Sequence, residues 1–356
     1  MKELWKGSHA MAEAAIRAGA RLYCGYPITP QSEIMEYMSE RMPQVGRIFI
    51  QAESELVSIN TVYGGALTGN RCVTSSSGVG ISLMQEGITS CFSKGLPILI
   101  INVNRTGAGM GGGGGEGGSF SGGQDDYTRE THGGGNGYYR NLVFIPDSIQ
   151  EAVDMIYNAW DIAEPYRNPV VLYTEGRLAQ MMEAVEMPEF KEREPLDWGV
   201  DGTSKEMKEY RAMNKEYYKY KQRIDLMREN EQQWEEYLLD DAEVVVVAVG
   251  LCSRVCRGSI NKLRAQGAKI GMLRPKAVWP FPQKGFDALP KSVKKIVCVE
   301  NSSGPEMLED VIVAMRYTDH LKTVPVYSST REGLIPTKEL IPFLQGVIDG
   351  TVKEVG

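Results

Sequence analysis

The sequence predicts an α/β protein with a doubly wound parallel sheet, followed by a second, smaller α/β unit. Short apolar runs rich in β-branched residues alternate with segments of helical period, which is typical of a parallel sheet with helices on both faces. A charged stretch interrupts this pattern, which then resumes. The chain has 356 residues, whereas single cores usually stop growing near ~250 to 300 residues, so two units are expected.

The first unit is expected to cover residues 1–180. Its strands are predicted at 21–28, 47–52, 71–76, 97–103, 142–147 and 169–175. Its helices are predicted near 10–18, 32–42, 55–63, 79–94 and 149–163. Thr29 before Pro30 indicates an N-cap with proline in the first turn, and Asp147 or Ser148 begins the last helix.

A linker over residues 181–240 and a second unit over residues 241–356 complete the expected organisation. The linker is rich in Glu, Lys, Gln and Met from residue 204 onward, which favours a long, solvated helix that crosses between the units. In the second unit, strands are predicted at 242–250, 269–275 and 294–301, helices at 253–267 and 305–317, and a final strand and helix after them.

Composition and charge exclude several classes of function. Acidic residues number 46 and basic residues 39, so the formal charge of −7 gives no general electrostatic footprint for nucleic acid or an anionic membrane. The N-terminus has no apolar core like that of a signal peptide, and no segment offers ~18 uninterrupted apolar residues. A cytoplasmic protein that acts on a small molecule or another protein is therefore expected.

The six cysteines are scattered through apolar runs, and only Cys252 and Cys256 lie near each other. Their spacing matches neither a zinc ribbon nor an iron–sulfur ligand set. Buried free thiols are expected, and reactive or ligating thiols are the alternative. Any redox metal centre that this protein uses is expected on other chains.

Polar residues follow three of the expected strands, and ligands of doubly wound sheets bind beyond the carboxyl ends of strands. Thr29, in GYPITP, offers a hydroxyl at a helix start to a carboxylate, or is an ordinary N-cap. Glu53 and Glu55 open a helix, where they are partners of its dipole or, with a pKa raised by burial, proton donors to a cofactor ring. Arg105 is suited to binding a carboxylate through two parallel hydrogen bonds, and the alternative is a salt bridge at the rim of the sheet.

These motifs occur in a recognisable order. The succession GYPITP, ESELVSINTVYGGALTGNRCVTSSSGVGISLMQE, PILIINVNRTG and FIPDSIQEAVDMIYNAW resembles the pyrimidine-binding (alpha-type) subunit of thiamine-diphosphate-dependent 2-oxoacid:ferredoxin oxidoreductases. EEYLLDDAEVVVVAVG and LRPKAVWPFP are similar to the transketolase C-terminal-like domain of that subunit. Within the family, the 2-oxoisovalerate (branched-chain) type is the most similar. The resemblance implies a thiamine-diphosphate-binding pyrimidine module in the first unit.

The resemblance also implies roles for individual residues. The glutamate that hydrogen-bonds the pyrimidine ring falls on Glu55, with Glu53 as second choice, and a protonated carboxyl there favours the imino tautomer that removes the thiazolium proton. The turn against the pyrimidine falls on Ser75, Ser76, Ser77 and Gly78. The groups near the 2-oxoacid fall on Tyr26, Pro27, Ile28, Thr29 and Arg105, of which Thr29 and Arg105 hold its carboxylate.

Two motifs of the family are missing from this sequence, and their absence implies partner subunits. In the family, the diphosphate and Mg²⁺ are held by a GDG-containing module and electrons leave through cysteine-bound iron–sulfur clusters, but this sequence has neither GDG nor CxxCxxC. The chain is therefore expected to work with a diphosphate-binding subunit, a gamma-type subunit and a ferredoxin-like iron–sulfur subunit. Together they would convert a 2-oxoacid and CoA to acyl-CoA and CO2 while reducing ferredoxin, and the chain alone would be inactive.

Three alternatives stay open at this point. The substrate is a branched-chain 2-oxoacid in the first interpretation and 2-oxoglutarate or another 2-oxoacid in the second. A subunit that only assists assembly would keep the fold without a working site. A nucleotide-binding dehydrogenase is disfavoured, because no GxGxxG follows the first strand with an acid ~20 residues later.

The glycine run over residues 107–123 departs from the family pattern, in which a short Gly/Pro/Ser/Thr segment follows the arginine. It is longer than a phosphate-binding turn and has no Lys-Ser/Thr at its end. Because glycine is costly to order, we expect a loop beside the substrate pocket that is mobile or ordered by a partner. His132, beyond this run, is expected to be hydrated rather than an acid or base.

Overall fold

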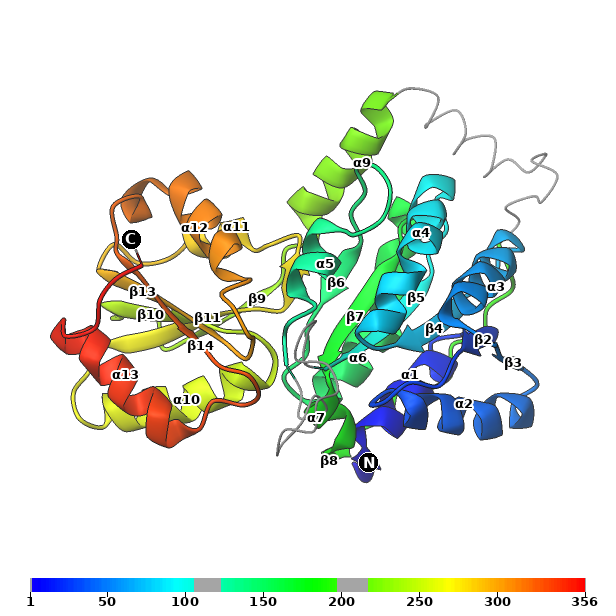
Figure 1. The fold of residues 1–356 in the computed structure, drawn as a ribbon, viewed down its shortest axis with the longest axis horizontal. Helices are drawn as coiled ribbons and strands as arrows, with labels where there is room; N and C mark the ends of the chain where they lie inside the picture. Colours follow the sequence, from blue (N-terminus) through cyan, green and yellow to red (C-terminus); the bar gives the residue numbers. More distant parts are fainter. Residues whose placement is uncertain (1, 106–122, 197–216, 356) are drawn as a thin grey trace.

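The structure is a computed structural model that describes residues 2–105, 123–196 and 217–355. The glycine run and the first part of the charged linker, for which a loop and a helix were predicted, lie outside these residues. Two lobes lie side by side, each built on a β-sheet with helices packed against it (Figure 1).

The first lobe contains a seven-stranded sheet with the order β12-β6-β7-β5-β4-β2-β3. All neighbouring pairs are parallel except β12 with β6. The strands are β2 (Leu22–Gly25), β3 (Ile48–Gln51), β4 (Cys72–Ser76), β5 (Leu99–Asn104), β6 (Leu142–Phe144), β7 (Val170–Glu175) and β12 (Ala277–Trp279). The predicted strands of the first unit are therefore present as parallel strands. A small antiparallel pair, β1 (Glu3–Lys6) with β8 (Met182–Val185), lies beside this sheet.

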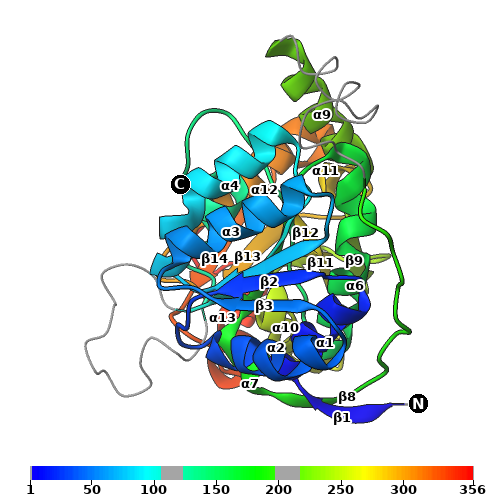
Figure 2. The ribbon, with the colours of Figure 1, turned by 90° about the vertical axis from the view of Figure 1, so that its right-hand side faces the viewer.

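Helices cover both faces of this sheet, as the alternating pattern predicted. Figure 2 shows α3 and α4 on one side of β2 and β3, and α1 and α2 on the other. The helices of this lobe are α1 (Gly7–Arg17), α2 (Ser32–Gln44), α3 (Glu55–Leu67), α4 (Val79–Lys94), α5 (Tyr127–His132), α6 (Ile149–Tyr166) and α7 (Gly176–Gln180). Ser148 caps α6, since its hydroxyl accepts a hydrogen bond from the Glu151 amide at 3.2 Å.

The predicted N-cap at Thr29 is wrong. Residues 29–31 form a turn in which the Gln31 amide donates to the Ile28 carbonyl at 2.8 Å, and α2 begins only at Ser32. Thr29, Pro30 and Gln31 belong to this turn and not, as predicted, to the start of the helix. Thr29 is thereby left exposed at the edge of the sheet.

The second lobe contains a five-stranded sheet with the order β14-β13-β10-β11-β9. Its strands are β9 (Trp234–Tyr237), β10 (Val244–Val247), β11 (Ile270–Pro275), β13 (Lys295–Glu300) and β14 (Val326–Thr330). Its helices are α10 (Gly250–Arg264), α11 (Gln283–Asp287), α12 (Leu308–Tyr317), the 3₁₀ turn η1 (Asp319–Leu321) and α13 (Thr337–Asp349). All neighbouring pairs are parallel except β9 with β11.

The charged stretch before the second lobe does not continue as one helix. α9 (Tyr217–Asn230) ends before Trp234, and β9 then pairs with β11 with Trp234 opposite Pro275 and Tyr237 opposite Met272. Aromatic residues favour strands, and the free edge of β11 offers backbone partners, so tertiary pairing overrides the helical propensity of the surrounding Glu and Gln.

All six cysteines are buried and none forms a disulfide, which confirms the expectation of buried free thiols. Burial raises the pKa of the Cys72 thiol to about 12 and keeps it protonated. Across the three described ranges, no helix is long and apolar enough to cross a membrane.

The two lobes are joined by a shared sheet and a buried ion network. β12 comes from the second half of the chain but pairs with β6 of the first sheet. Just before β12, Arg274 binds both carboxylate oxygens of Glu151 at 2.7 and 2.8 Å and Glu235 at 2.8 Å, with only 3% of its side chain exposed. Burial alone would raise the pKa of Glu151, but hydrogen bonds and charge from Arg274 and Lys276 hold it well below its usual range.

Replacing Arg274 by Met should destabilise the chain by about 3–5 kcal/mol, because it leaves buried Glu151 without its main counter-ion. Since the pKa of Glu151 is lowered to about 2 in the folded chain, this contribution is complete at neutral pH, begins to fall near pH 4.5 and is lost only as the pH approaches 2, so that the difference between the two proteins at pH 4 is slightly smaller than at pH 7. Thermal unfolding of wild type and R274M at pH 7 and pH 4 measures both effects.

A matched control is K269M, because Lys269 pairs with Glu243 at 3.3 Å and its side chain is 58% exposed. Such an exposed pair contributes about 0–1 kcal/mol. Equal losses in R274M and K269M would contradict a role of Arg274 in holding the lobes together.

Candidate active site

The predicted site residues lie at one edge of the first sheet. β2, β3, β4 and β5 are parallel, so their carboxyl ends meet at the same edge. The segments that follow these strands start at Tyr26, Ala52, Ser77 and Arg105. Residues distant in sequence are thereby gathered at this edge.

Arg105, Thr29 and Gly78 are in direct contact. The Arg105 guanidinium Nη1 donates to the Thr29 carbonyl at 3.1 Å. A Cβ on Gly78 would lie 3.0 Å from Arg105 Nε, and Gly78 has a φ of +47°, so glycine provides both the space and the backbone conformation for this approach. Among the described residues, no carboxylate forms an ion pair with Arg105, whose guanidinium is bound to the Thr29 carbonyl.

Glu55 is the first residue of α3 and is buried, with 5% of its surface exposed. Its carboxylate faces the first turn of α4, where a Cβ on Gly80 would overlap both Glu55 Oε1 and Ser76 Oγ. Glu53, two residues earlier, is exposed. The structure therefore places Glu55, and not Glu53, inside the edge that the strands form.

The serines of TSSSG differ in their surroundings. Ser75 Oγ bonds the Tyr23 hydroxyl at 2.7 Å and also accepts from Gln31 Nε2, so its side chain is engaged within the fold. The hydroxyls of Ser76 and Ser77 are buried and have no hydrogen-bond partner among the described residues. Since buried polar atoms are normally paired, these two hydroxyls are the ones suited to a ligand.

Residues Tyr26, Pro27 and Ile28 lead from β2 to the turn at Thr29. Tyr26 is 37% exposed, and Pro27 and Thr29 are exposed as well. These side chains line the outer part of the edge and remain open to solvent in the isolated chain.

Two asparagines of β5 also belong to this edge but were not predicted. Asn102 Nδ2 donates to Asp126 at 3.0 Å and to Glu130 at 2.9 Å. Asn104 is fully buried, and both polar atoms of its amide lack a partner. The signal in the sequence was the pair of amides in LIINVN, an otherwise apolar strand.

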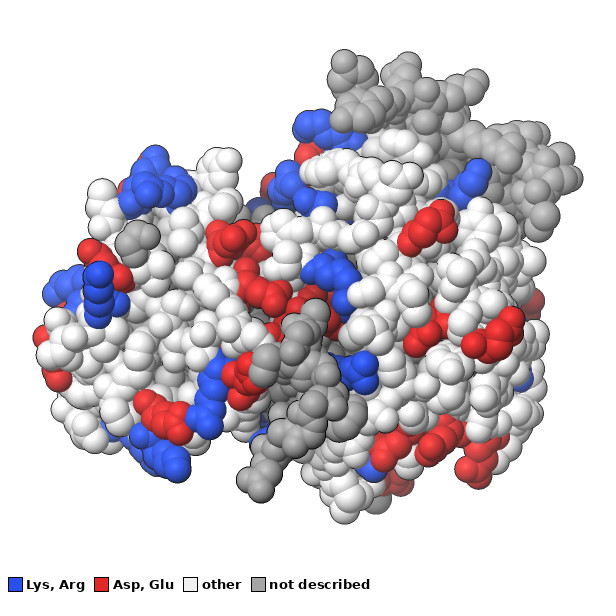
Figure 3. All heavy atoms as spheres, viewed as in Figure 1, with Lys and Arg blue, Asp and Glu red and all other residues white. Residues whose placement is uncertain are grey.

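The segment after the glycine run is attached to the second lobe. The Gln124 amide donates to the Asn301 carbonyl at 2.7 Å, and the Thr128 amide donates to Glu306 at 2.8 Å. The Tyr127 hydroxyl donates to Asp310 at 2.7 Å. Figure 3 shows charged side chains of both signs in the hollow between the lobes. The exit of the glycine run is therefore held by the loop and helix that follow β13.

Buried carboxyls surround this attachment. Burial raises the pKa of Glu130 to about 7, and the neighbouring Asp126 raises it further against the opposing effects of Arg129 and Asn102. Burial also raises the pKa of Glu175 to about 7, against a hydrogen bond from the Leu251 amide at 2.8 Å. His132 ends α5 with 45% of its side chain exposed, 3.7 Å from Asp310.

The fold of this chain is shared with solved structures of a transketolase and of a 2-oxoacid:ferredoxin oxidoreductase. A structure of an inactive β4 tetramer of a split-gene transketolase superposes with a TM-score of 0.60 over 96% of this chain and 98% of that one, at 12% identity. A 2-oxoglutarate:ferredoxin oxidoreductase from Magnetococcus marinus superposes with a TM-score of 0.80 over 98% of this chain and 65% of that one, at 22% identity.

The chain belongs to the pyruvate flavodoxin/ferredoxin oxidoreductase family. The model of that family's thiamine-diphosphate-binding domain matches residues 13–245, and the model of pyruvate:ferredoxin oxidoreductase core domain II matches residues 242–338. Ketoisovalerate oxidoreductase subunit VorB of Methanothermobacter thermautotrophicus is 41% identical over 88% of this chain and 89% of its own. 2-Oxoglutarate synthase subunit KorA of Methanocaldococcus jannaschii is 32% identical over 85% of this chain and 89% of its own.

These findings confirm the resemblance seen in the sequence. The protein is a subunit of a thiamine-diphosphate-dependent oxidoreductase of the 2-oxoacid:ferredoxin class. The relatives are named as subunits, so proteins of this family work in multi-subunit complexes.

Replacing Glu130 by Gln should raise the melting temperature at pH 8 by at least about 2 °C and leave it unchanged at pH 5. Burial raises the pKa of Glu130 to about 7, so its stabilising contribution is complete below the ordinary carboxyl range and is lost as the pH rises through 7. Gln keeps the acceptor for Asn102 and carries no charge. Melting curves of both proteins from pH 5 to pH 8 measure the difference.

E36Q is the control, because Glu36 is exposed and its replacement should give the same melting temperature difference at every pH. A difference for E130Q that does not vary with pH would show that Glu130 is ionised throughout this range.

Proposed function

We propose that this chain supplies the pyrimidine-activating half of a CoA-dependent 2-oxoacid:ferredoxin oxidoreductase whose substrate is a branched-chain 2-oxoacid. The reaction would yield acyl-CoA and CO2 with reduction of ferredoxin. The observation that carries the proposal is the buried carboxyl of Glu55 at the edge where Arg105 has no described counter-ion. When bound, thiamine diphosphate supplies the electron sink for decarboxylation.

Glu55 would hold a proton and donate it to the pyrimidine ring nitrogen. The residues beside it fit such a ring, because the unpartnered hydroxyls of Ser76 and Ser77 can hydrogen-bond polar atoms of a ligand. Gly80 leaves room for the Glu55 carboxylate at the first turn of α4. Ser75 would support this turn through its bonds to Tyr23 and Gln31.

Arg105 and Thr29 would bind the carboxylate of the 2-oxoacid. Arg129, another arginine at this edge, is already paired with Asp126 at 2.6 Å, whereas Arg105 has no described carboxylate partner. Val79 follows Gly78 directly and is 60% exposed, which offers an apolar surface beside Arg105. This apolar surface fits the side chain of a branched-chain 2-oxoacid better than the second carboxylate of 2-oxoglutarate.

The comparisons support the same substrate. The relative at 41% identity is named a ketoisovalerate oxidoreductase subunit, and the one at 32% is named a 2-oxoglutarate synthase subunit. 2-Oxoglutarate remains the second candidate, because the chain is similar to both.

A diphosphate-binding subunit would dock against the first turns of α3 and α4. Leu56, Val79 and Leu83 are 49%, 60% and 57% exposed there, next to Glu55. A subunit that brings the cofactor to Glu55 would cover these side chains and remove their apolar surface from water. A gamma-type subunit and a ferredoxin-like iron–sulfur subunit would complete the route for electrons.

In the assembled complex, E55Q should lower turnover by about 10²- to 10⁴-fold, the range typical of a lost proton-transfer group. Gln preserves the size of the side chain but cannot hold the proton. Steady-state reduction of a viologen dye with 2-oxoisovalerate and CoA measures turnover, and co-purification of the partner subunits shows that assembly is intact.

E53Q is the matched control, because Glu53 is exposed two residues away and its loss should leave turnover within about twofold. Near-normal turnover of E55Q would disprove the assignment. Absence of thiamine diphosphate and of substrate-dependent activity in the wild-type complex would instead identify a subunit that only assists assembly.

R105M should lower kcat/KM for the 2-oxoacid on the order of 10- to 100-fold, the effect of losing a charged hydrogen bond, mainly through KM. R105K should recover part of the loss. R316M is the control, since Arg316 is exposed on α12 of the second lobe.

A panel of 2-oxoacids measured on the wild-type complex tests the substrate. We expect a higher kcat/KM for 2-oxoisovalerate than for 2-oxoglutarate. The opposite order, or an unchanged KM in R105M, would contradict the proposed carboxylate site.

A further inference from the structure

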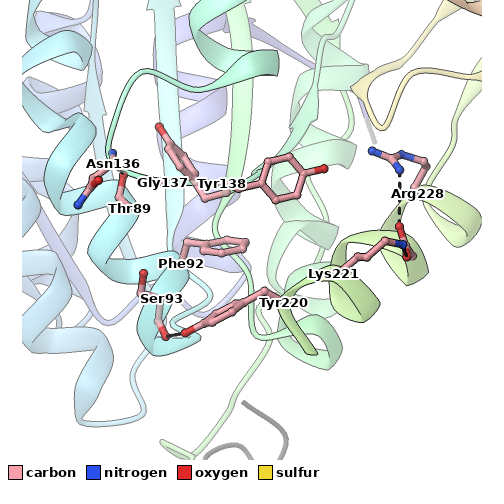
Figure 4. Close-up of a pocket in the computed structure, with 11 residues that line it drawn as sticks. Thr89, Phe92, Ser93, Asn136, Gly137, Tyr138, Tyr220, Lys221 and Arg228 are labelled. Atoms are coloured by element: carbon pink, nitrogen blue, oxygen red, sulfur yellow. Dashed lines mark hydrogen bonds and ion pairs between the residues drawn. The ribbon is translucent and has the colours of Figure 1, made fainter. Parts of the chain in front are cut away.

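A cavity of about 520 Å³ lies at the far end of α4 from Gly78 and Glu55. It is formed by the last turns of α4, the segment 136–139 before β6, and α9 (Figure 4). α4 has 16 residues and is about 24 Å long at 1.5 Å per residue, so it separates the cavity from the candidate active site. None of the residues that line this cavity takes part in the function proposed above.

The inner wall of the cavity is aromatic and rigid. The rings of Phe92 and Tyr220 stack with centroids 5.7 Å apart and an interplanar angle of 25°. The Tyr220 hydroxyl donates to the Ser93 carbonyl at 3.3 Å. Tyr139 packs on Phe92 at 5.9 Å, and its hydroxyl donates to Gln85 at 2.6 Å. This wall is therefore formed without any ligand.

Tyr138 forms the outer wall. It is 54% exposed, and the Arg140 guanidinium lies 5.0 Å from the centre of its ring. Figure 4 shows Tyr138 and Tyr220 on either side of Phe92, with Thr89 and Asn136 at one end of the cavity. A flat ring system that enters between Tyr138 and Phe92 would contact aromatic faces, and the exposed Asn136 amide could bind its polar edge.

The α9 side of the cavity is positively charged. Lys221 and Arg228 share one carboxylate, Asp225, with Arg228 at 3.6 Å and Lys221 in closer contact. Behind this wall, the buried Arg223 lies over the Phe92 ring at 4.1 Å and donates to the Phe92 and Arg167 carbonyls. Among the described residues that line this side, two cations face one carboxylate, and this excess of positive charge favours an anionic group.

From this arrangement we infer that the cavity binds a nucleotide, with its base between Tyr138 and Phe92 and its phosphate at Lys221 and Arg228. Aromatic side chains stack on any nucleic acid base, and Lys and Arg bind phosphate. The volume lies in the ordinary range of small-ligand sites, ≈ 300–1,000 Å³. Because α4 separates the two sites, a nucleotide here would act on the enzyme from a distance and would not take part in the reaction.

Isothermal titration of the assembled complex with AMP tests this inference. We expect saturable binding of AMP, and at least tenfold weaker binding of adenosine and of inorganic phosphate, because each fragment reaches only half of the cavity. Y138A and R228E should each weaken AMP binding at least tenfold. Turnover without AMP should be unchanged in both variants.

Y317A and R331E are matched controls, because Tyr317 is 76% exposed and Arg331 is an exposed, ion-paired arginine, both on the second lobe. Both should bind AMP like the wild type. Absence of AMP binding at millimolar concentration, or equal binding by Y138A, R228E and the wild type, would overturn the inference.

Two further outcomes would replace it with another occupant. Displacement of AMP by CoA would assign the cavity to the nucleotide end of the coenzyme and overturn the assignment to a free nucleotide. Loss of a partner subunit from the Y138A complex, without AMP binding in the wild type, would identify the cavity as a protein interface.

Discussion

The parallel pairing of β5 with β4 and β7 is the constraint on which the rest of the molecule depends. Every residue of β5 is buried, so its backbone groups must be satisfied by both neighbouring strands. This sets Asn102 opposite Ser76 and Asn104 opposite Glu175. Because this register fixes where each strand ends relative to its neighbours, it decides which side chains meet at the carboxyl edge of the sheet.

The sequence predicted the elements that depend on local pattern. Buried apolar runs identified β2, β4, β5 and β7, and helical periodicity identified α3, α4 and α6, because these signals lie within each segment. β1, β8 and β12 were not predicted, because each owes its existence to a distant partner. Glu3 pairs with Val185, and Ala277 pairs with Phe144, and no short stretch of sequence contains both members of such a pair.

The same distinction between local signals and distant partners explains which residues of the candidate site could be predicted. Arg105 and Glu55 follow strands, so their position at the edge could be inferred from the strand that precedes each of them. The TSSS run could not be resolved from sequence, because alternation along a strand sends Ser75 toward Tyr23 and Ser76 toward Gly80. Asn102 was missed because its partners, Asp126 and Glu130, lie beyond the glycine run.

The attachment of residues 124–128 to the second lobe makes the two halves of the chain interdependent. Gln124 and Thr128 bond residues 301 and 306, so the segment 124–128 is positioned by a part of the chain up to 178 residues farther along. Grafting the second lobe of a relative onto this first lobe would therefore disturb Asp126 and Glu130, which bind Asn102 of β5, unless residues 123–132 were exchanged with it. A substitution in either segment therefore changes the fit of the other, so the two must be redesigned together in any chimera.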